Sequence, residues 1–168
     1  MISLCWQGPF SFRSILTDGE KRDKFYFPGV YLWLETPPSG VRNVSYVGKA
    51  TSSLWKRHLQ HYASLIGGLY NIPKEFCCWG QDWVPDKQRA NVVEVVLDKD
   101  RFMAVVEAGF NRAAATEVYL CPLLDKGIDL AAVERQLLFE FQPSMTKRGT
   151  MSPPKSSIDI EHLNRPWE

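Results

Sequence analysis

Several familiar signatures are missing from this sequence. Its four cysteines include no CxxC pair, which argues against a structural zinc site, and Cys77 and Cys78 are adjacent. No basic segment followed by an apolar run opens the chain, so we expect no secretory signal peptide. No run approaches about 18 apolar residues, the length that indicates a membrane-spanning helix. Together, these absences predict a cytoplasmic protein whose thiols are reduced and which does not bind a membrane.

An excess of one charge is also missing from the chain as a whole. The formal net charge is +1 over 168 residues, whereas a nucleic-acid-binding domain is usually more basic. The cations are instead concentrated locally, because the stretch 49–61 contains no Asp or Glu. Its basic or titratable residues are Lys49, Lys56, Arg57, His58 and His61. If the protein binds an anion, we therefore expect the binding surface to lie in the stretch 49–61.

Hydrophobic residues make up 45% of the chain, enough for a core, and their spacing predicts an α+β fold. Alternating apolar residues predict strands at 29–35 and 43–50, joined by the turn sequence TPPSG, and a further strand at 116–124. This hairpin would place Tyr31 roughly opposite Tyr46. Helices are predicted from Ser52 or Ser53 to about Ile66 and over 129–141. Between them, 91–98 reads as a strand and 99–113 as a helix.

The first predicted helix carries Arg57 and His61 four residues apart, so the two side chains share one face. Lys49 leads into this helix from the end of the preceding strand. A strand end followed by a helix start suits a phosphate, because free backbone N–H groups and the helix dipole both favour an anion. The alternative interpretation is an ordinary solvated basic face.

The last predicted helix places Glu134 within a stripe of apolar residues, beside Val133 and Leu137. Burying a lone carboxylate costs several kcal/mol unless it is paired or binds a metal. Glu134 is therefore a candidate metal ligand, or else a rim residue paired with an arginine. Tyr31 and Tyr46 likewise have a purely structural alternative, since strand tyrosines commonly pack their rings.

In combination, these elements resemble the GIY-YIG nuclease family. GVY at 29–31 and YVG at 46–48 are similar to its two name-giving motifs, Arg57 and His61 to its first helix, and VERQLLFEFQP to its glutamate-bearing helix. The resemblance implies a small three-stranded antiparallel sheet flanked by helices, here with an inserted strand-helix segment at about 67–115. The domain would cover 29–143, after a lead-in at 1–28 and before a tail at 144–168.

The resemblance also implies a metal-dependent DNA endonuclease. Glu134 would hold one Mg²⁺ or Mn²⁺, Tyr31 would be the general base and Arg57 would stabilise the transition state. Because the ordinary pKa of tyrosine is near 10, Tyr31 would need help from its neighbours. The implied catalytic residues are Tyr31, Tyr46, Arg57, His61 and Glu134, and the implied substrate-binding residues are Lys49, Lys56 and Thr146. Thr146 stands where the family usually has asparagine.

Three functional hypotheses follow from the sequence. The first is an active DNA endonuclease, for which two-strand cutting would favour a homodimer. The second is a catalytically inactive DNA-binding or regulatory module on the same fold. The third is an interaction protein whose motif is coincidental. Candidate substrate-reading residues in the insertion and tail are Trp79, Trp83, Lys87, Gln88, Arg89, Asn91, Lys147, Arg148 and Lys155. For the two tryptophans, the alternative role is packing within the loop.

Overall fold

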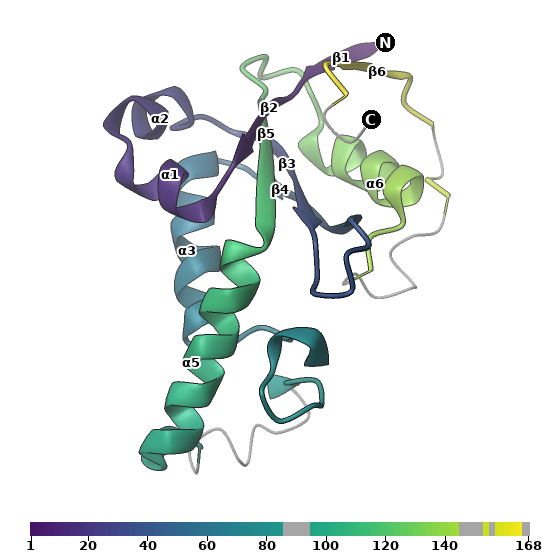
Figure 1. Cartoon of the computed structure of the whole chain (residues 1–168). Coiled ribbons are helices and arrows are strands. Elements are labelled where there is room, and N and C mark those ends of the chain that lie inside the picture. The colour runs from purple at the N-terminus through teal and green to yellow at the C-terminus, as the bar shows by residue number, and fades with distance from the viewer. Residues whose placement is uncertain (86–94, 145–152, 155–156, 166–168) are drawn as a thin grey trace. The chain divides into compact units, whose positions relative to one another are not determined.

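The computed structural model describes residues 1–85, 95–144, 153–154 and 157–165 (Figure 1). The chain divides into two compact units. The first, which we call the sheet unit, comprises residues 1–35, 42–58 and 116–168; the second, the insertion unit, comprises 36–41 and 59–115. The insertion unit contains the segment 67–115 in which the sequence predicts an insertion.

The sheet unit is built on a four-stranded antiparallel sheet with strand order β2-β5-β3-β4. Strands β3 (Gly29–Glu35) and β4 (Asn43–Ala50) have the predicted bounds, and β5 (Thr116–Pro122) ends two residues before the predicted end. The three-stranded prediction was wrong because β2 (Gln7–Phe10) pairs with β5 as a fourth strand. Its Gly8-Pro9 pair breaks the strand pattern in the sequence, and an edge position tolerates the proline.

One face of this sheet forms the main hydrophobic core. Alternate residues of β3, namely Val30, Leu32 and Leu34, pack with Val133 and Leu137 of α6 (Leu130–Phe141). The helix begins at Asp129, whose side chain accepts hydrogen bonds from the Ala131 and Ala132 backbone N–H groups. The predicted helix over 129–141 is confirmed, and its residues Val133 and Leu137 face the sheet.

The two ends of the described chain also meet on this unit. Strand β1 (Ile2–Cys5) pairs in parallel with β6 (Ile160–Leu163) as a separate two-stranded sheet. Trp6 donates a hydrogen bond from Nε1 to Nδ1 of His162 at 3.0 Å. The lead-in and part of the tail are therefore structured elements of the sheet unit.

The opposite face of the sheet packs against α1 (Phe12–Thr17) and against the first turns of α3 (Leu54–Ile66). The α1 side chain Phe12 lies edge-on against Trp33, with ring centroids 5.1 Å apart. The short helix α2 (Gly19–Lys24) follows α1, and Asp18 caps its N-terminus. Helix α3 starts one residue after Ser53, whose Oγ accepts the Lys56 N–H as the sequence predicts.

The insertion unit contains η1 (Lys74–Phe76) and α5 (Lys99–Ala114), which confirms the helix predicted at 99–113. The strand predicted at 91–98 was wrong for 95–97, which are helical; 91–94 lie outside the described residues. The run VVEVV has β-branched residues typical of a strand, but Asp98 starts α5 by accepting the backbone N–H groups of Asp100 and Arg101.

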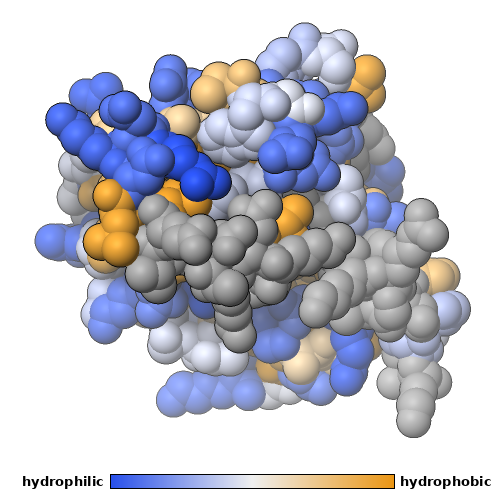
Figure 2. Space-filling model, turned by 90° about the horizontal axis from the view of Figure 1, so that it is seen from below, coloured by the Kyte–Doolittle hydropathy of each residue, from blue (hydrophilic) through white to orange (hydrophobic). Residues whose placement is uncertain are grey.

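Hydrophobic side chains are exposed mainly in small groups. The face shown in Figure 2 is largely hydrophilic, with small separated areas of hydrophobic residues among the described atoms. Of the large hydrophobic residues that the structure describes, Leu97 is the most exposed after Met1, at 81% of its surface. Within the described residues, no helix is both long and apolar enough to cross a bilayer.

Candidate active site

The two motif tyrosines lie on the same face of the sheet, but they are not cross-strand partners. Tyr31 faces Gly48, and Tyr46 faces Trp33. The tyrosines, predicted to lie roughly opposite one another, are therefore offset by two residues along the strands. Their rings still meet diagonally across the two strands, stacked with centroids 6.0 Å apart. Tyr31 has no exposed surface, whereas Tyr46 is half-buried.

Arg57 reaches this tyrosine face from the first turn of α3. Its Nε lies 3.5 Å from the phenolic oxygen of Tyr31, to which it donates a hydrogen bond at the long end of the range. The Ser53 cap and the hydrogen bond from Arg57 N to Ser53 O fix where the helix begins. The structure thus brings together two predicted catalytic residues that are 26 positions apart.

His58 follows Arg57 in the sequence and was not among the predicted site residues. It is fully buried, and its ring lies edge-on to Tyr31 with centroids 4.7 Å apart. The Leu54 carbonyl can only accept, so Nδ1 of His58 donates to it at 2.8 Å and Nε2 accepts from Trp33 Nε1 at 3.3 Å. The pKa of His58 is lowered to about 4, chiefly because burial disfavours the charged ring; the Leu54 carbonyl opposes this effect and the nearby Arg57 charge adds to it.

A neutral His58 therefore supports the tyrosine face by packing and by two hydrogen bonds. The sequence carried one signal for this role, since His58 is four residues after Leu54 and falls on the apolar side of the helix. His61 was the more prominent choice because it is spaced four residues from Arg57.

Glu134 and Lys49 form an ion pair on the other face of the sheet. Lys49 is the cross-strand partner of Val30, whose side chain belongs to the core beneath α6, so Lys49 projects to the α6 side. The Glu134 side chain is 21% exposed and that of Lys49 30%. Glu134 therefore occupies a partly buried rim position in the apolar stripe, and its partner is a lysine rather than the arginine of the alternative interpretation.

Five predicted residues of the sheet unit thus form two groups, with the sheet between them. Tyr31, Tyr46 and Arg57 lie on the α3 side, and Lys49 and Glu134 lie on the α6 side. Both groups adjoin β4, which is an edge strand of the four-stranded sheet, and Gly48 and Lys49 are consecutive residues of it. A ligand that contacts both groups has to pass around this edge.

The remaining predicted residues are placed elsewhere. His61 belongs to the insertion unit, where it is fully buried and its Nδ1 is hydrogen-bonded to the Tyr70 hydroxyl at 2.6 Å. Lys56 is exposed, with its ammonium 4.9 Å from the centre of the Tyr26 ring. Thr146 lies outside the described residues, as do the substrate-reading candidates Lys87, Gln88, Arg89, Asn91, Lys147, Arg148 and Lys155.

The acidic groups of the site are few. Among the described residues, no three His, Cys, Asp or Glu side chains are grouped so that they could hold a metal ion together. One carboxylate is nevertheless sufficient for Mg²⁺, which keeps several of its waters and commonly takes one or two carboxylates together with substrate phosphate. Glu134, partly exposed and bonded to a displaceable ammonium, fits that pattern.

The fold defines an α+β protein with a four-stranded antiparallel sheet and a two-stranded parallel sheet. No protein-family model matches the chain, and no curated protein or solved structure matches it significantly.

Proposed function

We propose that this protein is a metal-dependent endonuclease that hydrolyses DNA phosphodiester bonds at the β4 edge of its sheet. The observation that carries the proposal is the contact between the Arg57 guanidinium and the Tyr31 hydroxyl. The guanidinium places a positive charge beside the phenolic oxygen, where a proton acceptor and a phosphate would meet. Ordinary packing of a buried strand tyrosine does not require an arginine at its hydroxyl.

In the proposed reaction, Tyr31 takes the proton of the attacking water, and Arg57 stabilises the negative charge that develops on the phosphate. Arg57 is half-buried, so its charge is less screened by water than that of a fully exposed arginine. Preorganised donors of this kind contribute about 100- to 1000-fold in rate. Tyr46 packs on Tyr31 and holds its ring in place.

Glu134 would hold the single Mg²⁺ or Mn²⁺, and the metal when bound supplies a Lewis acid for the phosphate and leaving oxygen. A metal ion and the Lys49 ammonium compete for the same carboxylate. Lys49, released from Glu134, would then be free to contact a phosphate oxygen at the β4 edge. Lys56 adds an exposed cation to that helix start.

Access to the phenol sets a condition on this proposal. Tyr31 has no exposed surface, so a water can reach its hydroxyl only if the region around Gly48 opens. Gly48 lies on an edge strand and has no side chain, so the approach from that edge crosses the least protein. We expect substrate binding to widen this edge.

The test is nicking of a supercoiled plasmid with Mg²⁺ or Mn²⁺, with and without chelator. Glu134→Gln and Arg57→Gln should each lower the rate at least 100-fold. Glu140→Gln on the same helix and Arg13→Gln on α1 are the matched controls, because Glu140 bonds His162 and Arg13 is exposed, away from both groups. Equal loss in the controls, or nicking that survives Glu134→Gln, contradicts the assignment. A panel of flap, hairpin and single-stranded DNA then defines the substrate.

A DNA-binding module without cleavage is the second candidate. The full burial of Tyr31 and the engagement of Glu134 by Lys49 favour it. Salt-dependent retention of DNA by the wild-type protein, with no nicking by either metal, would support this candidate. Absence of both retention and nicking would leave neither function standing.

A further inference from the structure

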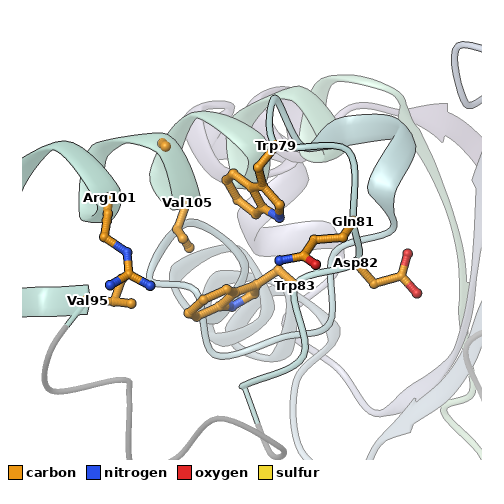
Figure 3. Close-up of a pocket in the computed structure, with 8 residues that line it drawn as sticks. Trp79, Gln81, Asp82, Trp83, Val95, Arg101 and Val105 are labelled. Carbon is orange, nitrogen blue, oxygen red and sulfur yellow. The ribbon is translucent and has the colours of Figure 1, made fainter.

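A cavity of about 300 Å³ lies within the insertion unit, and its lining includes no residue of the proposed catalytic groups (Figure 3). Its volume is at the lower end of the range typical of small-ligand sites. The lining residues are Trp79, Gln81, Asp82, Trp83, Val95, Arg101, Ala104 and Val105. The cavity therefore combines aromatic and aliphatic walls with charged and amide groups.

Trp83 is a fixed wall of this cavity. It is 6% exposed, its Nε1 donates to the Gly68 carbonyl at 2.7 Å, and its backbone pairs with Ile72 in an antiparallel bridge. Val105 of α5, also buried, packs close to Gly68, where a Cβ would meet its Cγ1. The packing alternative thus holds for Trp83, whose indole is part of the unit's own core.

Trp79 differs from Trp83 in exposure and in its surroundings. It is half-buried, and its ring meets Trp83 edge-on, with centroids 6.4 Å apart and an angle of 74° between the planes. An edge-on contact covers little of the face of a ring. Figure 3 shows the Trp79 ring beside the cavity, above Trp83. Its indole is accordingly suited to stack on a flat ligand.

The cavity has two exposed side chains of opposite charge, Arg101 and Asp82. Arg101 stands on the first turn of α5, and Figure 3 shows it and Asp82 on opposite sides of the two indoles. Asp82 is held in place because its Oδ1 accepts the Lys74 backbone N–H at 2.9 Å. Gln81 adds an amide that can both donate and accept. A heteroaromatic ring with donors and acceptors can pair with these groups, whereas a purely apolar ring cannot.

We propose that this cavity receives one unpaired nucleobase of a DNA strand, stacked on Trp79. Gln81, whose amide lies between the two indoles in Figure 3, pairs with the edge of the base, and Arg101 binds the adjoining phosphate. The inference rests on the proposed function, to which it adds a substrate class: DNA with single-stranded or displaced bases. Stacking on an aromatic side chain requires the base to be out of the duplex.

The experiment uses the full chain in chelator, so that binding is measured without cleavage. A short single-stranded oligonucleotide carrying the fluorescent base 2-aminopurine is titrated and compared with the same sequence in a duplex. We expect the single strand to bind more tightly and its fluorescence to fall on stacking. Trp79→Leu should weaken binding by about 5- to 100-fold and abolish the fluorescence change, whereas Trp79→Phe should restore most of both.

A second comparison tests the contact between Arg101 and the phosphate. It sets Arg101→Gln beside the control Lys99→Gln, which removes the same charge from the same helix outside the cavity. Only Arg101→Gln should weaken binding and lower the salt dependence by about one phosphate contact. Thermal unfolding checks that the half-exposed Trp79 variants remain folded. Unchanged affinity in folded Trp79→Leu, or competition by an aromatic peptide but not by mononucleotides, overturns the inference.

The two proposals can fail separately. If plasmid nicking depends on Glu134 but Trp79→Leu does not change oligonucleotide binding, only the proposal of a base-binding cavity is contradicted. If oligonucleotide binding depends on Trp79 but neither metal supports nicking, the base-binding cavity is supported and the proposed endonuclease activity is contradicted.

Discussion

Tyr31 and Gly48 are cross-strand partners, and the phenol of Tyr31 lies over the glycine where a side chain would otherwise stand. A Cβ built on Gly48 would overlap the phenolic oxygen and the ring atom that bears it. The second motif therefore needs glycine for a steric reason that involves the tyrosine of the first motif. The two motifs act as one structural unit, and each fixes the other.

Gly48→Ala should destabilise the protein by about 1–3 kcal/mol, because Tyr31 is fully buried and has no room to move aside. Urea unfolding followed by fluorescence measures the change. Gly19→Ala on α2 is the matched control, since a Cβ there meets nothing within 4 Å. It should change the free energy of unfolding by less than about 0.5 kcal/mol. Equal stability of both variants would show that the phenol is not confined over Gly48.

His58 should make stability depend on pH in the acidic range. Its pKa is about 4 in the folded protein against an ordinary value of 6.5, chiefly because burial disfavours the charged ring. Between those values the unfolded chain binds a proton that the folded chain does not, so stability falls as the pH decreases from 6.5 to 4. The full loss is about 3 kcal/mol.

A His58→Gln variant separates this effect from that of the carboxylates. It should be less stable at neutral pH, because the bonds to Leu54 and Trp33 are disturbed, but its stability should change less steeply over the same range. Urea unfolding of both proteins at a series of pH values gives the comparison. If the two slopes coincide, His58 is not the group responsible.

Much of the fold can be predicted from hydrophobic periodicity and capping residues. Strands β3 and β4 and helices α5 and α6 follow from alternating or helical apolar spacing that agrees with their burial. Strand β2 does not, because Gly8 and Pro9 mask its pattern and its partner β5 lies more than 100 residues away. Local sequence also cannot show that 95–97 are helical, since the run VVEVVL is rich in the β-branched residues typical of a strand.

The site is predictable only in part, for a related reason. Spacing along one strand or helix gives the face on which each side chain lies. It correctly places Tyr31 and Val30 on opposite faces of the sheet. It does not give hairpin register, which pairs Tyr31 with Gly48, nor which face of the sheet a distant helix covers. Glu134 and Lys49 therefore meet on the face opposite Arg57, an arrangement set by the packing of Val133 and Leu137.

The four cysteines should divide into two reactive and two protected thiols. Cys5 and Cys78 are exposed, whereas Cys77 and Cys121 are buried. Burial raises the pKa of Cys77 to about 11 and that of Cys121 to about 12, so little thiolate forms near neutral pH. Timed alkylation of the native protein with mass mapping should modify Cys5 and Cys78 first. Early labelling of Cys121 would contradict its place in the core between β3 and α6.

The Lys49–Glu134 pair leads to the most discriminating prediction for the proposed chemistry, because metal binding and catalysis should respond in opposite directions. In Lys49→Met the carboxylate loses its competing cation, so Mn²⁺ affinity should rise by about fivefold, equivalent to about 1 kcal/mol for a partly exposed ion pair. Plasmid nicking should nevertheless fall, because the ammonium is no longer available to the phosphate. Calorimetric titration with Mn²⁺ measures the first effect and initial nicking rates the second. Glu134→Gln is the reference for both and should bind no Mn²⁺ at this position. Unchanged Mn²⁺ affinity in Lys49→Met would mean that the carboxylate is not the metal ligand, and the proposed role of α6 in catalysis would have to be abandoned.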